Sequence, residues 1–191
     1  MQKKDNITLR VPEGIECDCG KDALSAIMTR KSIRRYTEQC IPDAYIQTLL
    51  YTGMCAPSAH NLRPYSFVVI KDKEKLKTIA DKSTYAKMAA FCDVCIVVCG
   101  DTEIQKDNVR LIEDCAAVTQ NILLAAHALG LGAVWCGAGK TCPWHDFLHN
   151  LLGLPESVSA MSLIPLGFPD EAGRSFERFE SSKIHYERWS D

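Results

Sequence analysis

A long helical pattern from about residue 105 to residue 129 constrains this chain more than any other feature. Its small and apolar positions recur at alternating spacings of three and four residues, at Val109, Ile112, Ala116, Thr119, Leu123 and Ala126. The second half of the stretch is apolar on nearly every side, so this helix needs burial all round. A chain of 191 residues offers limited depth for such burial. We therefore expect the helix to lie at a dimer interface.

Other segments predict strands separated by shorter helices. Residues 66–70 and 94–99 are continuous apolar runs, typical of strands covered on both faces. Residues 133–136 and 158–167 predict two further strands. Shorter helices are expected at residues 22–30, 43–54, 73–82, 84–91 and 144–152.

Composition limits the classes of protein to which the chain can belong. With 191 residues, 47% of them hydrophobic, it can build one substantial core. We expect a single domain over residues 22–191 after a polar N-terminal extension over residues 1–21. The 22 Lys and Arg residues nearly balance the 24 Asp and Glu residues. Overall charge therefore favours neither nucleic acid nor an anionic membrane as a partner.

The N-terminus lacks the apolar run of a signal peptide, and no apolar stretch reaches the roughly 18 residues typical of a membrane span. The ten cysteines are scattered through apolar stretches, which favours buried, reduced thiols over a disulfide framework. We therefore expect a soluble cytoplasmic protein. Cys17-Asp18-Cys19 and Cys92-Asp93-Val94-Cys95 lack a second ligand pair at finger-like spacing, so no metal site is predicted.

Two neighbouring segments have the composition of a binding site. Arg30-Lys31-Ser32-Ile33-Arg34-Arg35 places four cations and a hydroxyl at a helix end. If this segment is extended, Arg30, Ser32 and Arg34 share one face and can bind a phosphate or another delocalised anion. Taken alone, the cluster fits a solvated basic turn better. The second segment, residues 56–65, is rich in turn formers and hydrogen-bonding side chains, and loops directly before a strand often carry function.

Three other patterns are weaker. Gly139-Lys140-Thr141 has the ending of a phosphate-binding P-loop, but Val134 stands where the first glycine is required. Gly130-x-Gly132 fails as a dinucleotide fingerprint because Trp135 replaces the last glycine and a helix precedes the strand. Cys55 with His60, and Cys142 with His145 or His149, could form Cys–His pairs. Packing is the simpler role for them, since no third, activating group can be assigned.

Five motifs occur in order along the chain: Arg30-x-Ser32-x-Arg34-x-Tyr36, Pro57-Ser58-x-x-Asn61-x-Arg63-Pro64-Tyr65, Gly130-Leu131-Gly132 before Trp135, Pro165-Leu166-Gly167-Phe168-Pro169, and Ile184-His185-Tyr186-Glu187-Arg188-Trp189. In this order and spacing they resemble the FMN-dependent nitroreductase family, from about residue 22 to the C-terminus. The resemblance implies an α+β fold of three α-β-α layers with a central mixed sheet. It also implies an intertwined homodimer with one FMN in each of two pockets at the interface.

The resemblance also implies roles for individual residues. Arg30 and Ser32 would hold the FMN phosphate and ribityl chain, and Arg34 would reach the N1/O2 edge of the flavin. A guanidinium at that edge would stabilise the negative charge of reduced flavin. The further cofactor-binding residues would be Lys31, Pro57, Ser58, Ala59 and Asn61 (the last four from the opposite subunit), Pro165, Leu166 and Gly167, Lys87 near the ring and Arg178 near the phosphate. Backbone N–H groups near Leu166 and Gly167 would face flavin N5.

The implied activity places the chemistry on the flavin, so no catalytic side chain is predicted. FMN would take hydride from NAD(P)H and then reduce a small acceptor such as a nitroaromatic or a quinone, with ping-pong kinetics. Lys31, Arg63 and Tyr65 stand where relatives often carry Arg, Gln and Trp, which leaves substrate preference open. The alternative is a flavin-binding carrier or a thiol redox sensor without efficient turnover.

Overall fold

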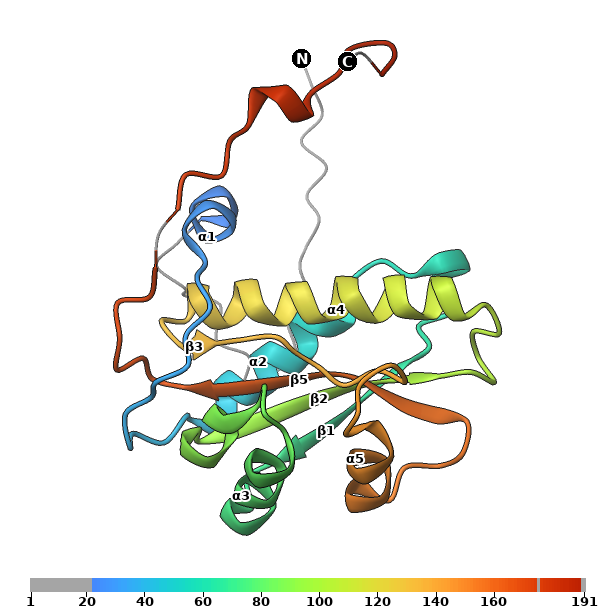
Figure 1. Ribbon diagram of the computed structural model, residues 1–191. Coiled ribbons are helices and arrows are strands. Elements are labelled where there is room, and N and C mark those ends of the chain that lie inside the picture. The colour runs from blue at the N-terminus through green and yellow to red at the C-terminus, as the bar shows by residue number, and fades with distance from the viewer. Residues whose placement is uncertain (1–21, 175, 190–191) are drawn as a thin grey trace.

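The structure is a computed structural model that describes residues 22–174 and 176–189, and it forms three layers (Figure 1). A central sheet carries α2 (Asp43–Met54) and α4 (Asn108–Ala128) on one face. The other face carries α3 (Lys73–Lys82) and α5 (His145–Leu152). Separate apolar cores lie on the two faces, one around Leu49 and Ile122 and the other around Leu76 and Leu148. The expected α+β, three-layer architecture is confirmed, and the expected extension over residues 1–21 lies outside the described residues.

The sheet has the order β1-β2-β5-β3, formed by β1 (Tyr65–Ile70), β2 (Val94–Asp101), β5 (Val158–Gly167) and β3 (Gly132–Ala133), and β4 (Cys136–Gly137) also pairs with β5. Every pairing among the described residues is antiparallel, whereas a mixed sheet was expected. The chain explains this difference. It returns from β1 through α3 and η2 (Lys87–Phe91) to the same end of the sheet, where Ile70 pairs with Cys95. After α4, β3 runs parallel to β2, but β5 lies between them.

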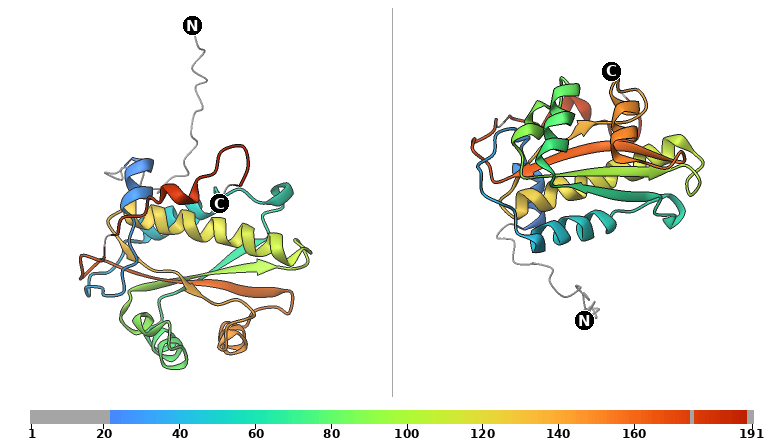
Figure 2. Two further views of the ribbon diagram at one scale, coloured as in Figure 1. Left: turned by 45° about the horizontal axis from the view of Figure 1, so that its top comes forward. Right: turned by 90° about the horizontal axis from the view of Figure 1, so that it is seen from below.

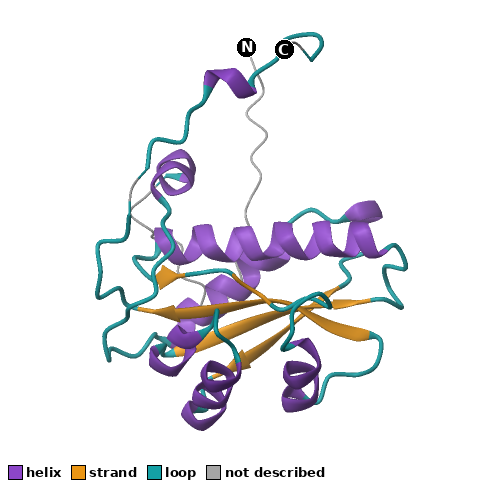
Figure 3. Cartoon of the chain, in the orientation of Figure 1, coloured by secondary structure: helices purple, strands orange, loops and turns teal. Residues whose placement is uncertain are grey.

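The strand expected at residues 133–136 is interrupted. Gly132 pairs with Gly167 in β3 and Cys136 pairs with Leu163 in β4, so both pieces keep one register against β5. Val134 and Trp135 lie outside both short strands. Figure 3 shows the strands of the sheet in orange between the purple helices. Val134 is buried beneath α5, while Trp135 is 42% exposed.

The predicted helices form close to their expected bounds, and capping residues mark where α3 and α4 begin. Asp72 precedes α3 and accepts a hydrogen bond from the Lys75 N–H at 3.0 Å, and Asp107 caps α4 in the same way. The first helix, α1 (Ala23–Thr29), packs on α4. Residues 84–91 form only the short 3-10 turn η2. No helix in the described part of the chain is long and apolar enough to cross a membrane.

The burial of α4 differs from the expectation. In its second half, Ile122, Leu123 and Ala126 are buried within the same chain, so their burial alone requires no second subunit. Exposed apolar side chains also gather at the start of α4 and on α1, at Val109, Ile112, Leu24, Ile27 and Met28. The C-terminal residues run away from the sheet past α1, as the views of Figures 1 and 2 agree.

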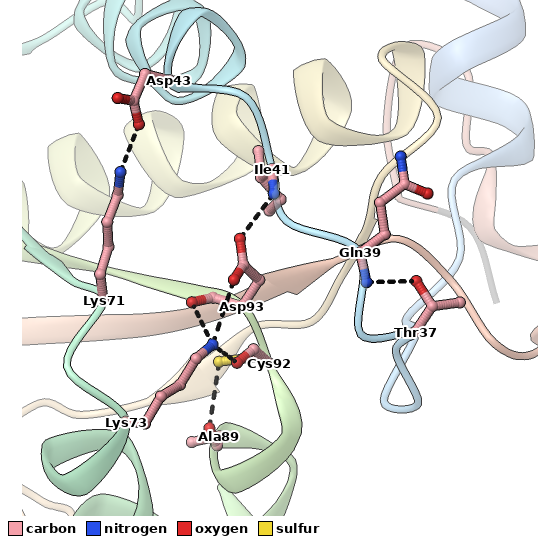
Figure 4. Close-up of polar contacts among 9 residues, drawn as sticks. All are labelled: Thr37, Gln39, Ile41, Asp43, Lys71, Lys73, Ala89, Cys92 and Asp93. Atoms are coloured by element: carbon pink, nitrogen blue, oxygen red, sulfur yellow. Dashed lines mark hydrogen bonds and ion pairs between the residues drawn. The ribbon is translucent and has the colours of Figure 1, made fainter.

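Asp93 ties the segment before α2 to the start of β2 (Figure 4). Its carboxylate accepts from the Ile41 N–H at 2.7 Å and pairs with Lys73 Nζ at 3.3 Å. The Asp93 N–H in turn donates to Leu166 O at 2.9 Å. The chain at Ile41 is thereby fixed near the end of β5 at Leu166. The same end of the sheet holds residues 30–35, called the basic segment below.

Candidate functional site

A cavity of about 740 Å³ lies beside the basic segment. Five cationic side chains and one carboxylate line it, together with three other residues of the 170s and Ser32: Arg30, Lys31, Ser32, Arg34, Glu171, Ala172, Gly173, Arg174, Phe176 and Arg178. Its volume falls within the range of small-molecule and cofactor pockets.

The basic segment is extended after α1 ends, as the sequence predicts. The Ile33 N–H donates to Ala133 O at 2.9 Å, and Tyr36 bridges to Pro169. Ile33 and Tyr36 are both buried in the core. Because alternate residues of an extended chain point to opposite sides, burial of Ile33 directs Ser32 and Arg34 toward the cavity.

Three glycines allow the basic segment to approach the sheet and the 170s. A Cβ on Gly132 would lie 2.6 Å from Ile33 Cγ2, and one on Gly167 would lie 2.7 Å from Tyr36 Cβ. Gly173 has a φ of +66°, and a Cβ there would lie 2.8 Å from Ile33 Cδ1. Tyr36 therefore occupies the space beside Gly167, so this position has no room for a side chain.

Glu171 connects the two walls of the cavity. Its carboxylate accepts hydrogen bonds from the backbone N–H groups of Arg34 and Arg35, the latter at 3.2 Å. These bonds, the Arg34 N–H foremost, hold the pKa of Glu171 below its usual value. On the same wall, Lys31 Nζ donates to Ala172 O at 3.2 Å. Glu171, Gly173 and Arg174 were not predicted as site residues; the polar run after Pro169 was the only available signal.

Arg30 and Arg178 both line this cavity. Arg178 Nη2 donates to the backbone oxygen of Arg30 at 2.9 Å. Burial, followed by the charge of Arg178, lowers the pKa of Arg30. Like charges held together in a partly buried place favour a bound anion, and a phosphate accepts the fork of each guanidinium. Arg178, which is distant from Arg30 in the sequence, thus lies beside it in the fold.

Arg34 also lines a second cavity, of about 500 Å³, with Lys87, Met88 and Phe91. Lys87 Nζ reaches Asp81 O at 3.5 Å. The two cavities share Arg34, so a ligand with an anionic end and a planar end could extend from one to the other. Pro165, Leu166 and Gly167 form the nearby end of β5; the Leu166 side chain is buried and Pro165 O accepts from the Tyr36 hydroxyl at 3.2 Å.

The Pro57–Asn61 loop lies elsewhere in the chain. The Ala59 N–H donates to Asp114 Oδ1 at 2.7 Å, near the start of α4. Ser58 Oγ accepts from the Arg63 N–H at 3.0 Å. His60 and Asn61 adopt left-handed φ values of 53° and 56°. Strained backbone of this kind is common at functional sites.

The two predicted halves of the site are far apart within one chain. Thr29, next to Arg30, contacts His127 at the far end of α4, at 2.8 Å between Oγ1 and Nε2. Asp114 and His127 are 13 residues apart in this helix, which corresponds to roughly 20 Å at 1.5 Å per residue. In Figure 1, α1 stands at one end of α4 and the teal segment near residue 60 at the other. The chain therefore does not bring Arg30 and Asn61 to one place by itself.

The other sequence hypotheses gain no support. Gly139-Lys140-Thr141 borders a third cavity of about 430 Å³, which is lined mainly by apolar groups such as Ile112, Trp135 and Met161. No group of three or more His, Cys, Asp or Glu side chains in the described part of the chain could hold a metal. Burial raises the pKa of Cys92, Cys99 and Cys115 to about 12, so these thiols are unreactive.

Comparisons with known proteins agree with this geometry. The sequence profile described as the Nitroreductase family matches residues 27–90 and 85–168. A candidate NADH dehydrogenase/NAD(P)H nitroreductase of Methanothermobacter thermautotrophicus is 40% identical over 88% of this chain and 88% of its own. An NADPH-flavin oxidoreductase of Vibrio harveyi is 32% identical over 78% of this chain and 67% of its own. A candidate nitroreductase of Desulfovibrio desulfuricans, solved in complex with FMN, has a TM-score of 0.77 at 32% identity, covering 89% of this chain and 99% of its own.

Proposed function

Because the chain belongs to the nitroreductase family, we propose that it binds FMN in the cavities around Arg34 and uses NAD(P)H to reduce a small acceptor. It is an FMN-dependent NAD(P)H oxidoreductase. The observation that carries the assignment is the contact of Arg178 with Arg30 in the first cavity. Arg34 lines both this cavity and the second one.

The residues present fit FMN. Arg30, Arg178 and Ser32 would hold the phosphate, since the two guanidinium groups repel each other until an anion lies between them. Lys31 and Arg174 add positive charge at the same place. Arg34 would lie at the flavin edge that becomes negative on reduction, and Lys87 would lie nearby. FMN, when bound, supplies hydride and electron transfer, so the protein contributes binding, orientation and charge stabilisation.

The acceptor and the kinetic order belong to this proposal. The second cavity is about 500 Å³ and is bordered by Met88 and Phe91, with Phe91 73% exposed. Such a site can admit two planar substrates in turn, and we propose nitroaromatics or quinones as acceptors, with ping-pong kinetics. A cytoplasmic location is also proposed, because the eight described cysteines are all unpaired thiols.

We further propose that the active form is an intertwined homodimer with FMN at the interface. Within one chain the Pro57–Asn61 loop lies at the opposite end of α4 from Arg30, so a second chain in antiparallel orientation could supply the loop. Exposed apolar side chains on α1 and at the start of α4 support such an interface. In the C-terminal residues, Phe179, Tyr186 and Trp189 are each more than 70% exposed and need a surface to cover them.

An absorbance spectrum of the purified protein tests the proposed function. We expect a yellow protein whose flavin bands bleach on anaerobic addition of NADH or NADPH and return when a quinone is added. A flavin that binds but never bleaches would instead support a carrier. A protein that stays colourless after incubation with FMN would contradict the proposal.

A further inference from the structure

Arg63, directly after the Pro57–Asn61 loop, is a cation that the proposed function does not use. Its backbone N–H donates to Ser58 Oγ at 3.0 Å, and its Nε donates to Asn61 Oδ1 at 3.0 Å. None of the ion pairs within residues 22–174 and 176–189 includes Arg63. The side chain is exposed, and the two terminal nitrogens of its guanidinium remain available to a ligand.

The backbone fixes the direction in which Arg63 leaves the loop. Arg63 has a φ of 51°, in the left-handed region that arginine rarely adopts. His60 and Asn61 share this conformation, and hydrogen bonds to Ser58 and Asp114 hold the loop from both sides. The backbone thereby fixes the direction of the Arg63 Cα–Cβ bond, and the Nε bond to Asn61 restrains the guanidinium.

A second guanidinium lies against the same loop. Arg110 Nη1 lies 3.1 Å from His60 Nε2. Because arginine can only donate, His60 Nε2 is the acceptor in this contact. Arg110 also pairs with Asp107 at 3.5 Å, which offsets its charge. The charge of Arg63 has no such partner, so Arg63 is the stronger anion-binding group of the two.

We propose that Arg63 binds an anionic group, a phosphate or carboxylate, of a substrate that occupies the flavin site formed with a second copy of this chain. The inference rests on the proposed function, in which Asn61 reaches the flavin of the other subunit. Arg63 is hydrogen-bonded to Asn61 and therefore lies at the mouth of the same site. The planar fork of a guanidinium matches phosphate and carboxylate oxygens equally well. The proposal thus predicts that this enzyme prefers charged substrates.

Two substrates could supply this anion. The electron donor NADPH carries a 2′-phosphate that NADH lacks, and an acceptor could carry a carboxylate. Anaerobic stopped-flow measurements of the two half-reactions separate these sources. The reductive half-reaction compares NADPH with NADH, and the oxidative half-reaction compares 4-nitrobenzoate with the neutral 4-nitrobenzyl alcohol.

The variants are Arg63→Gln, Arg63→Lys and, as a control, Lys77→Gln on α3, which covers the other face of the sheet. In Arg63→Gln we expect the second-order rate constant to fall about fivefold for either NADPH or 4-nitrobenzoate. The rate constant for the matching partner, NADH or 4-nitrobenzyl alcohol, should not change. Arg63→Lys should recover part of the loss, and Lys77→Gln should behave as wild type. The half-reaction that is affected identifies the source of the anion.

Equal effects of Arg63→Gln on both members of each pair, or no effect on either, would overturn the inference. Loss of FMN from Arg63→Gln, measured as the flavin-to-protein absorbance ratio, would assign Arg63 to loop structure and would also overturn it. Wild-type protein is the internal standard for the proposed function. If wild type itself shows no flavin reduction, the proposed function fails; if only substrate selectivity is unchanged, the inference alone fails.

Discussion

At the scale of single residues, Asp114 and Gln105 are the two buried side chains in the described part of the chain with a polar atom that lacks a hydrogen-bond partner. Asp114 is 5% exposed, its Oδ1 accepts from the Ala59 N–H at 2.7 Å, and its Oδ2 has no hydrogen-bond partner among the described residues. A buried donor that loses its acceptor costs about 1–3 kcal/mol. The side chain of Asp114 therefore holds the Pro57–Asn61 loop at the cost of one unpaired oxygen.

We predict that Asp114→Leu lowers the free energy of unfolding by about 2 kcal/mol, because the Ala59 N–H is left without an acceptor. Asp114→Asn should lose less, since an amide oxygen can still accept and the buried charge is removed. Urea unfolding of both variants measures the difference, with Glu113→Gln on the exposed side of α4 as the control. Equal losses in the Leu and Asn variants would show that the hydrogen bond does not hold the loop.

The sequence predicted the residues of the basic segment that line the cavity, but it did not predict Glu171. Alternation in an extended chain predicted that Arg30, Ser32 and Arg34 share a face, and they line one cavity. Glu171 could not be found in this way. It acts through the backbone N–H groups of residues more than 130 positions away, and such a contact leaves no local pattern.

At the scale of elements, residues next to a helix predicted where the helix begins, whereas strand pairing could not be predicted from neighbouring residues. The start of α3 follows from Asp72, which caps its first turn, whereas α2 begins at Asp43 after Pro42 with no side-chain cap. The strand at residues 133–136 was predicted as continuous, and its interruption at Val134 and Trp135 depends on packing against other elements. The all-antiparallel pairing depends on β5 entering between β2 and β3, which no local pattern encodes.

The seating of the basic segment on β3 provides a test at this scale. We predict that Gly132→Ala weakens FMN retention and lowers the free energy of unfolding by about 1–3 kcal/mol, because its Cβ would lie 2.6 Å from Ile33 Cγ2 and displace Ser32 and Arg34 with it. Gly139→Ala is the matched control, since a Cβ there meets nothing within 4 Å. Flavin-to-protein ratio after dialysis and urea unfolding report the two effects. Unchanged FMN retention in Gly132→Ala would show that the positions of Ser32 and Arg34 do not depend on the position of Ile33.

At the scale of the whole molecule, the roughly 20 Å between the two halves of the site makes a prediction about stoichiometry. If a site combines Arg30 of one chain with the loop of the other, defects placed on different chains of a dimer fall in the same site. Arg30→Ala removes one guanidinium from the cavity. Asn61→Gly removes the amide without straining the backbone, because glycine tolerates its φ of 56°.

We predict that each variant homodimer loses FMN on dialysis, whereas a heterodimer of one Arg30→Ala chain and one Asn61→Gly chain retains about one FMN per dimer. In that heterodimer both defects share one site, and the other site combines an intact Arg30 with an intact loop. Two different affinity tags isolate the heterodimer, and its flavin absorbance gives the stoichiometry. If each chain built its own site, both sites would carry one defect and the heterodimer would lose FMN like the homodimers. Full retention by the Asn61→Gly homodimer would remove Asn61 from the flavin site altogether.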